Sequence, residues 1–163
     1  MESELFSKYV HRALDIAILL ACALLVTSLV QRYRVSKRLS GLTISLSGVD
    51  FSRSNKTLLL FLQQDCDICT ASLPFYRTLI DTFQDPRDVE LVLITPNQPD
   101  EASEFFKNEG LRFETVLQGK RGLLGVQLTP TLILADSTGT VHGSWIGQLS
   151  PQQKTVVWTM LKQ

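Results

Sequence analysis

Two cysteines lie close together near the middle of the chain, in the sequence Cys66-Asp67-Ile68-Cys69. They follow a continuous apolar run at residues 57–62, which is typical of a strand buried on both faces, and they begin a segment of helical periodicity. At a helix start, Cys66 meets free backbone N–H groups and a partial positive charge, which stabilise a thiolate. Cys69 lies one turn later, within disulfide distance of Cys66. The pattern predicts thiol–disulfide exchange, with Cys66 attacking and Cys69 resolving.

Other readings of the cysteine pair fit the sequence less well. A structural zinc site needs four ligands, and the only histidines are His11 and His142. An iron–sulfur cluster generally needs four cysteines, whereas the chain has 3. An inert core pair does not explain a position at a helix start between Asp65 and Asp67. We therefore expect no metal and no cofactor. The two aspartates are expected to tune the site, because their charge opposes the helix terminus and raises the thiol pKa.

The rest of the chain beyond residue 41 alternates between strand and helix patterns. A turn is expected at residues 136–139, and a last helix at Ser150-Pro151, with Ser150 as N-cap and Pro151 in the first turn. Alternating βαβ units imply parallel strands with right-handed crossovers, and the late hairpin adds antiparallel strands. The sequence predicts a mixed α/β sheet with helices on both faces, in one domain of residues 42–163. The expected strands are residues 43–46, 57–62, 90–95, 113–117, 131–135 and 140–146; the expected helices are residues 69–83, 99–109 and a last helix whose apolar face holds Val156, Val157, Met160 and Leu161.

The first forty residues differ from the remainder. The whole chain of 163 residues carries 16 basic and 16 acidic groups, which argues against a nucleic-acid binder. Residues 1–40 hold six of the basic groups and three of the acidic ones, around an apolar run at residues 16–30. The run is apolar around its whole circumference and lacks Gly and Pro, so we expect a transmembrane helix over about residues 13–33. Residues 1–35 then form a membrane anchor, and residues 36–41 a linker.

Two alternatives to an anchor remain open. Ala21-Cys22-Ala23 has the small-x-small form of a signal-peptide cleavage site, and the residues up to Cys22 loosely resemble a lipoprotein signal. The apolar residues that continue after Cys22 favour a span over both. The basic residues that follow the run outnumber those before it, which by the positive-inside rule places the large domain in the cytoplasm.

At the cysteine pair the sequence resembles the thioredoxin superfamily, over roughly residues 41–163. Pro74 lies five residues after Cys69, where that family has a proline that kinks the active-site helix. The segment that ends at Thr129-Pro130 resembles the family's cis-proline segment, which faces the disulfide and pairs with an extended substrate. Together with the anchor, the chain looks most like the membrane-tethered TlpA-like thioredoxins of bacteria. There are departures: Leu60 replaces the family's buried acid, and Asp65 its tryptophan.

The resemblance implies a function. The expected activity is a membrane-tethered thiol–disulfide oxidoreductase that reduces protein disulfides through Cys66 and Cys69, with Thr129 and Pro130 contacting substrate. Protein thiols, an unidentified electron donor and the membrane are the expected partners, for a monomer. Because disulfides persist outside the cytoplasm, we expect the domain on the extracytoplasmic, periplasmic side, against the basic-residue count. A thioredoxin-fold scaffold and a peroxiredoxin-like thiol peroxidase are the alternatives; Gln63 stands where the peroxiredoxin pattern has Thr.

Overall fold

A computed structural model describes residues 12, 14–27, 39–120 and 122–163 of the chain. The chain divides into two compact units, Met1–Arg34 and Val35–Gln163. Within the first unit, residues 14–27 form a helix whose apolar side chains are exposed around it. No helix among the described residues is both long and apolar enough to cross a membrane. Part of the expected span, residues 13 and 28–33, lies outside the described residues.

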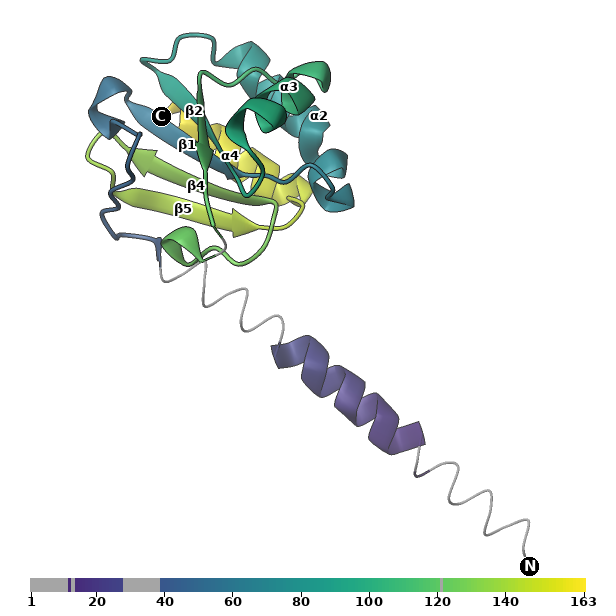
Figure 1. Ribbon diagram of the computed structural model, residues 1–163. Coiled ribbons are helices and arrows are strands. Elements are labelled where there is room, and N and C mark those ends of the chain that lie inside the picture. The colour runs from purple at the N-terminus through teal and green to yellow at the C-terminus, as the bar shows by residue number, and fades with distance from the viewer. Residues whose placement is uncertain (1–11, 13, 28–38, 121) are drawn as a thin grey trace, which may run out of the picture. The chain divides into compact units, whose positions relative to one another are not determined.

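The second unit is built on a mixed five-stranded sheet in the order β3-β2-β1-β4-β5 (Figure 1). β1 pairs parallel with β2, and β2 with β3, whereas β4 is antiparallel to both of its neighbours. Phe61, the last residue of β1, lies opposite Ile94 of β2 and Thr131 of β4. The C-terminal end of β1 therefore lies beside the start of β4, at the same end of the sheet. The strands are β1 (Lys56–Phe61), β2 (Val89–Thr95), β3 (Thr115–Gln118), β4 (Thr131–Asp136) and β5 (Val141–Ile146).

Helix ends are set by local side chains. In the last helix, Ser150 accepts from the backbone N–H of Gln153, and the Gln153 side chain accepts in return, which completes a capping box. Pro99 occupies the first turn of its helix, where a missing N–H costs nothing. The expected N-cap at Ser150 is confirmed. The helices are α2 (Asp67–Thr82), α3 (Pro99–Asn108) and α4 (Pro151–Lys162), with two 3-10 turns, η1 (Phe51–Arg53) and η2 (Leu123–Gly125).

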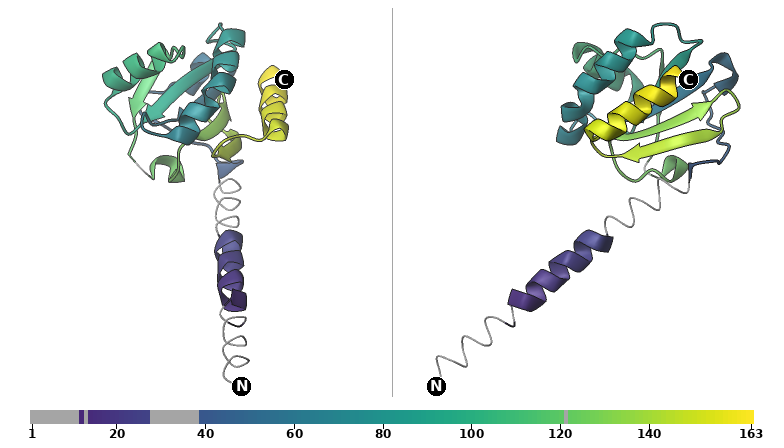
Figure 2. Two further views of the ribbon diagram at one scale, coloured as in Figure 1. Left: turned by 90° about the vertical axis from the view of Figure 1, so that its right-hand side faces the viewer. Right: turned by 180° about the vertical axis from the view of Figure 1, so that it is seen from behind.

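The helices α2, α3 and α4 contribute to one face of the sheet. Buried residues of α2, α3 and α4, such as Leu73, Phe106 and Val157, form one cluster with the inward residues of β1. Figure 2 (right) shows α2 and α4 on the same side of the strands. The opposite cluster contains Phe51 and Val126, packed by the irregular chain after Leu39 and by η2. The expectation of helices on both faces is wrong: β1, β2 and β3 advance in one direction, so two right-handed crossovers place α2 and α3 together.

Two smaller expectations also differ from the structure. The segment at residues 43–46 is no strand; it makes a single bridge, Thr43 to Thr140, and then crosses the sheet to pack Ile44 and Leu46 against the second cluster. In α4, Val156 is 48% exposed rather than buried. The other expected residues do face the sheet: Val157 and Leu161 are buried, and Met160 packs partly buried against the same cluster.

The β4–β5 hairpin closes as expected. Gly139 donates its N–H to the carbonyl oxygen of Asp136 at 2.9 Å and has a φ of +78°, which favours glycine. The Asp136 carboxylate accepts from the hydroxyl of Thr138 at 2.6 Å and lies 2.7 Å from Nε2 of His142. These contacts hold the pKa of Asp136 well below its ordinary value, the Thr138 hydroxyl most strongly. The turn lies at the end of the sheet away from the cysteines.

Candidate functional site

The cysteine pair lies where β1 ends and α2 begins. Cys66 is the N-cap of α2 in an extended conformation, and its Sγ accepts a hydrogen bond from the backbone N–H of Cys69 at 3.2 Å. The two residues form a disulfide, with their Cα atoms 5.1 Å apart, a separation that suits a disulfide bond. The same Cys69 N–H that donates to Cys66 Sγ here is placed to stabilise a thiolate after reduction.

The two sulfur atoms differ in access. Cys66 is half-buried, whereas Cys69 is 1% exposed and belongs to the cluster under the helices. Leu60, at 0% exposure, belongs to the same cluster. Leu60 is thus a buried apolar residue at the position where the resemblance expects a buried acid. Cys66 is therefore the sulfur that an external partner can reach, whereas Cys69 lies in apolar surroundings that disfavour its thiolate.

Thr129 and Pro130 lie against Cys66. The Thr129–Pro130 peptide bond is cis, and Gly147 donates its N–H to the carbonyl oxygen of Pro130 at 2.7 Å. The hydroxyl of Thr129 donates to Cys66 Sγ at 3.7 Å, and the carbonyl oxygen of Thr129 lies 3.9 Å from the same sulfur. The carbonyl contact can be a hydrogen bond only in the dithiol form, because a disulfide sulfur carries no proton. The structure thus brings together residues 63 positions apart.

The residues around the cysteines form an exposed rim. Asp65 and Asp67 are both exposed, and Asp67 is the first residue of α2. Ile68, between the two cysteines, is 51% exposed. The rim of the disulfide is therefore acidic and apolar. Trp145, in β5, packs instead against the cluster under the helices.

A polar contact that sequence reasoning missed holds the loop before Cys66. Asn97 follows the neighbouring strand β2, and its Oδ1 accepts from the backbone N–H of Gln64 at 3.3 Å and from the hydroxyl of Thr95 at 3.1 Å. Cys66 in turn donates its N–H to the carbonyl oxygen of Gln64 at 2.9 Å. The signal for this contact was present, because polar residues that follow adjacent parallel strands meet at one edge.

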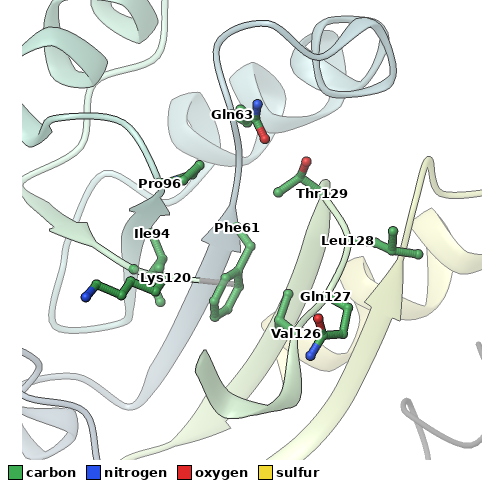
Figure 3. A pocket seen from close by; sticks show the side chains of 10 residues that line it. Phe61, Gln63, Ile94, Pro96, Lys120, Val126, Gln127, Leu128 and Thr129 are labelled. Atoms are coloured by element: carbon green, nitrogen blue, oxygen red, sulfur yellow. The ribbon is translucent and has the colours of Figure 1, made fainter. Parts of the chain in front are cut away.

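A cavity of about 170 Å³ lies beside Thr129 on the face opposite the α-helices (Figure 3). Figure 3 shows Phe61 and Ile94 between the ends of β1 and β2, with Thr129 across the opening. No pattern in the sequence indicated this cavity, because its walls come from four separate segments. In the described residues, no group of three His, Cys, Asp or Glu side chains is arranged to hold a metal ion.

Comparisons with known proteins agree with this arrangement. The sequence profile described as AhpC/TSA family matches residues 32–146. No curated protein matches the sequence. Among solved structures, a putative thiol:disulfide interchange protein DsbE from Chlorobium tepidum aligns with a TM-score of 0.56 at 20% identity, over 76% of this chain and 93% of that one.

Two further solved structures align with the chain. StoA from Bacillus subtilis aligns with a TM-score of 0.50 at 25% identity, over 66% of this chain and 84% of its own. The thioredoxin domain of a thiol-disulfide oxidoreductase from Bacteroides vulgatus aligns with a TM-score of 0.57 at 14% identity, over 75% of this chain and 97% of that one. The fold of the second unit is therefore that of thioredoxin.

Proposed function

Because the chain belongs to the AhpC/TSA family, within the thioredoxin superfamily, we propose that it is a thiol–disulfide oxidoreductase that reduces protein disulfides through Cys66 and Cys69. The observation that carries the proposal is the disulfide at the start of α2, with one accessible sulfur and one buried sulfur. Exchange needs this asymmetry: one thiol must reach a partner, and the other must be shielded until the mixed disulfide forms.

The reaction proceeds in two exchanges. The Cys66 thiolate attacks a sulfur of the substrate disulfide; a new Cys66–substrate bond forms, and the other substrate sulfur leaves as a thiolate and takes a proton. Cys69, after losing its proton, attacks Cys66 Sγ, so the mixed disulfide breaks and the second substrate thiol is released. Two electrons pass to the substrate, and Cys66 and Cys69 end as a disulfide. A separate dithiol donor must then reduce that disulfide.

Thr129 has two roles in this reaction, one toward Cys66 and one toward the substrate. Its hydroxyl donates toward Cys66 Sγ, which favours the thiolate as nucleophile and as leaving group. In the described chain, no backbone group hydrogen-bonds to the N–H or C=O of Thr129. These two groups are therefore open to pair with an extended substrate segment, the role that Thr129 and Pro130 have by resemblance.

Two opposing influences set the reduction potential. The N-terminus of α2 stabilises a Cys66 thiolate. The carboxylates of Asp65 and Asp67, which are exposed and lie on either side of Cys66 in the sequence, destabilise it. A less stabilised thiolate gives a more reducing couple, so we expect a potential nearer to about −270 mV than to about −120 mV. Equilibration with a glutathione or dithiothreitol buffer measures it, and a value above about −180 mV would contradict the expectation.

Reduction of insulin disulfides by the full chain in detergent, with a dithiol as donor, tests the proposal. The proposal is supported if the wild-type chain reduces insulin with multiple turnovers and the Cys66→Ser variant does not. A scaffold domain gives no turnover. A thiol peroxidase consumes hydrogen peroxide faster than it reduces insulin; Gln63 at the position of the peroxiredoxin threonine and the nearby Cys69 favour disulfide exchange over that activity.

The N-terminal unit is proposed as a membrane anchor, over about residues 13–33, with the thioredoxin-like domain on the extracytoplasmic side. Its support is the exposure of the apolar side chains on all sides of the helix at residues 14–27; water does not favour such a surface. Retention in membranes after alkaline extraction tests the anchor. A reporter fused after Gln163 tests the orientation, and a reporter found in the cytoplasm would overturn it.

A further inference from the structure

The cavity beside Thr129 lies on the face of the sheet opposite α2, α3 and α4. Its floor consists of Phe61 at the end of β1, Ile94 near the end of β2, and Val126 after η2. These three side chains also belong to the second hydrophobic cluster, so the cavity is an opening into that apolar core. Figure 3 shows Phe61 and Val126 side by side below Thr129.

The volume of the cavity limits the size of the group that it can hold. At about 170 Å³ it is smaller than the roughly 300–1,000 Å³ of sites that take cofactor-sized or drug-sized molecules. An apolar cavity of about 150 Å³ is large enough for a benzene ring. The cavity therefore fits one apolar side chain, from leucine to phenylalanine in size.

The polar side chains that line the cavity also restrict which side chain can enter it. Among the described residues that line the cavity, Lys120 is the one that carries a charge, and Figure 3 shows its ammonium group pointing away from Phe61 and Val126. Gln63 adds an uncharged polar group at the edge toward the cysteine loop. A lysine or arginine side chain entering here would lose hydration and meet Lys120, so a basic occupant is disfavoured.

The cavity adjoins the reacting sulfur. Thr129 lines the cavity, and its hydroxyl lies 3.7 Å from Cys66 Sγ. Phe61 ends the strand from which the chain continues through Gln63 to Cys66. An extended substrate advances about 3.3 Å a residue. A substrate segment whose cysteine is bonded to Cys66 and which runs along Thr129 therefore brings a residue one or two positions from that cysteine to the opening.

We propose that this cavity is a specificity site that receives an apolar side chain next to the reacting cysteine of a substrate polypeptide. The proposal rests on the proposed function and deepens it, because it assigns the substrate class: polypeptides with a leucine-like or phenylalanine-like residue beside the cysteine, rather than a lysine or arginine.

Three synthetic disulfide-linked peptides test the proposal with the full chain. They differ only in the residues on both sides of the cysteine, which are leucine, aspartate or lysine. We expect kcat/KM to fall in that order, with leucine above lysine by about tenfold, the discrimination typical of one apolar pocket. Equal values for the three peptides would overturn the proposal. Bis(2-hydroxyethyl) disulfide has no flanking side chain; if the protein reduces it but does not distinguish the peptides, the proposed function stands and the specificity site fails.

Two variants and one control test whether the preference for leucine over lysine arises in this cavity. Val126→Phe fills the floor and should bring the leucine-to-lysine ratio close to one. Lys120→Glu changes an exposed side chain, so folding is not at risk, and it should place the lysine peptide above the aspartate peptide. Lys107→Glu makes the same charge change on exposed Lys107 of α3, which packs on the opposite face, and should leave the order unaltered. If Val126→Phe does not fold, the Lys120→Glu variant alone tests the proposal. The proposal is overturned if kcat/KM in that variant still falls in the order leucine, aspartate, lysine.

Discussion

The two faces of the sheet are covered by different kinds of structure. Three α-helices pack on one face and enclose Cys69 with a continuous set of buried side chains. Irregular chain and two 3-10 turns cover the other face, and there the cavity opens beside Thr129. Regular helices fill the space over strands well, whereas loops leave gaps at their junctions. The helical face therefore shields Cys69, the proposed resolving thiol, and the irregular face holds the cavity that we propose for a substrate side chain.

The cysteines give the sharpest test of this difference. Replacing half-buried Cys66 with Ser should abolish turnover, because no other described thiol reaches a partner at this site. Replacing buried Cys69 with Ser should leave the first exchange intact and accumulate mixed disulfides, visible on non-reducing gels and by mass spectrometry. A Cys69→Ser variant that traps no covalent partner in the presence of disulfide substrates would show that the assignment of the two thiols is wrong.

Leu60 tests whether the helical face limits the second exchange. Leu60→Asp buries a carboxyl group beside Cys69 without a partner and should lower the free energy of unfolding by about 3 kcal/mol, measured in urea. At neutral pH the new carboxylate should also accelerate resolution of the mixed disulfide, because it provides a base for Cys69.

Leu60→Asn is the matched control, with nearly the same shape and no charge. It should be similarly destabilised, and its resolution rate should stay at the wild-type value. Equal rates in the Asp and Asn variants would mean that proton removal from Cys69 does not limit the reaction.

Two glycines test the irregular face. A Cβ on Gly139 would lie 2.6 Å from the carbonyl oxygen of Ile44, and its φ is +78°, so Gly139→Ala should cost about 2–3 kcal/mol of stability. Gly125 has a φ of +76° with no atom within 4 Å of such a Cβ. Gly125→Ala should therefore cost only about 1 kcal/mol. Thermal or urea unfolding measures both, and equal losses would mean that the contact with residue 44 does not constrain the turn.

Tyr76 gives the smallest effect, on the helical face. Its buried hydroxyl makes no well-formed hydrogen bond among the described residues; Ser72, one turn earlier, lies near it but donates its own proton to the carbonyl oxygen of Ile68 at 2.8 Å. Tyr76→Phe should therefore change the free energy of unfolding by less than about 1 kcal/mol at neutral pH.

The pH dependence of unfolding separates the wild type from that variant. Burial raises the pKa of Tyr76 above its ordinary value of 10.0. The unfolded chain then loses this proton at a lower pH than the folded chain, so wild-type stability should fall as the pH rises above about 10. Tyr76→Phe should lack that part of the decline. Identical alkaline slopes in the two proteins would contradict the burial of this hydroxyl.

Local patterns predicted the elements that hold the cysteines. The apolar run before Cys66, the helical periodicity after it and the turn at Gly139 each depend on residues within a few positions, and each appears in the structure. The expectation of helices on both faces was wrong because it depends on the order of the strands, which no short pattern encodes. Val156 was placed inward for a similar reason: periodicity indicates that a helix has an apolar face, but the neighbouring sheet decides which residues occupy it.

By itself, the sequence determined that a dithiol lies at the start of a helix after a buried strand, because residue type and spacing control local conformation and thiol chemistry. Only the tertiary structure decided that Cys69 is enclosed while Cys66 is accessible, that Thr129 lies beside Cys66, and that Asn97 holds the loop before it. The cavity also belongs to that second group. These features join segments tens of residues apart, and their contacts form only when the sheet has assembled.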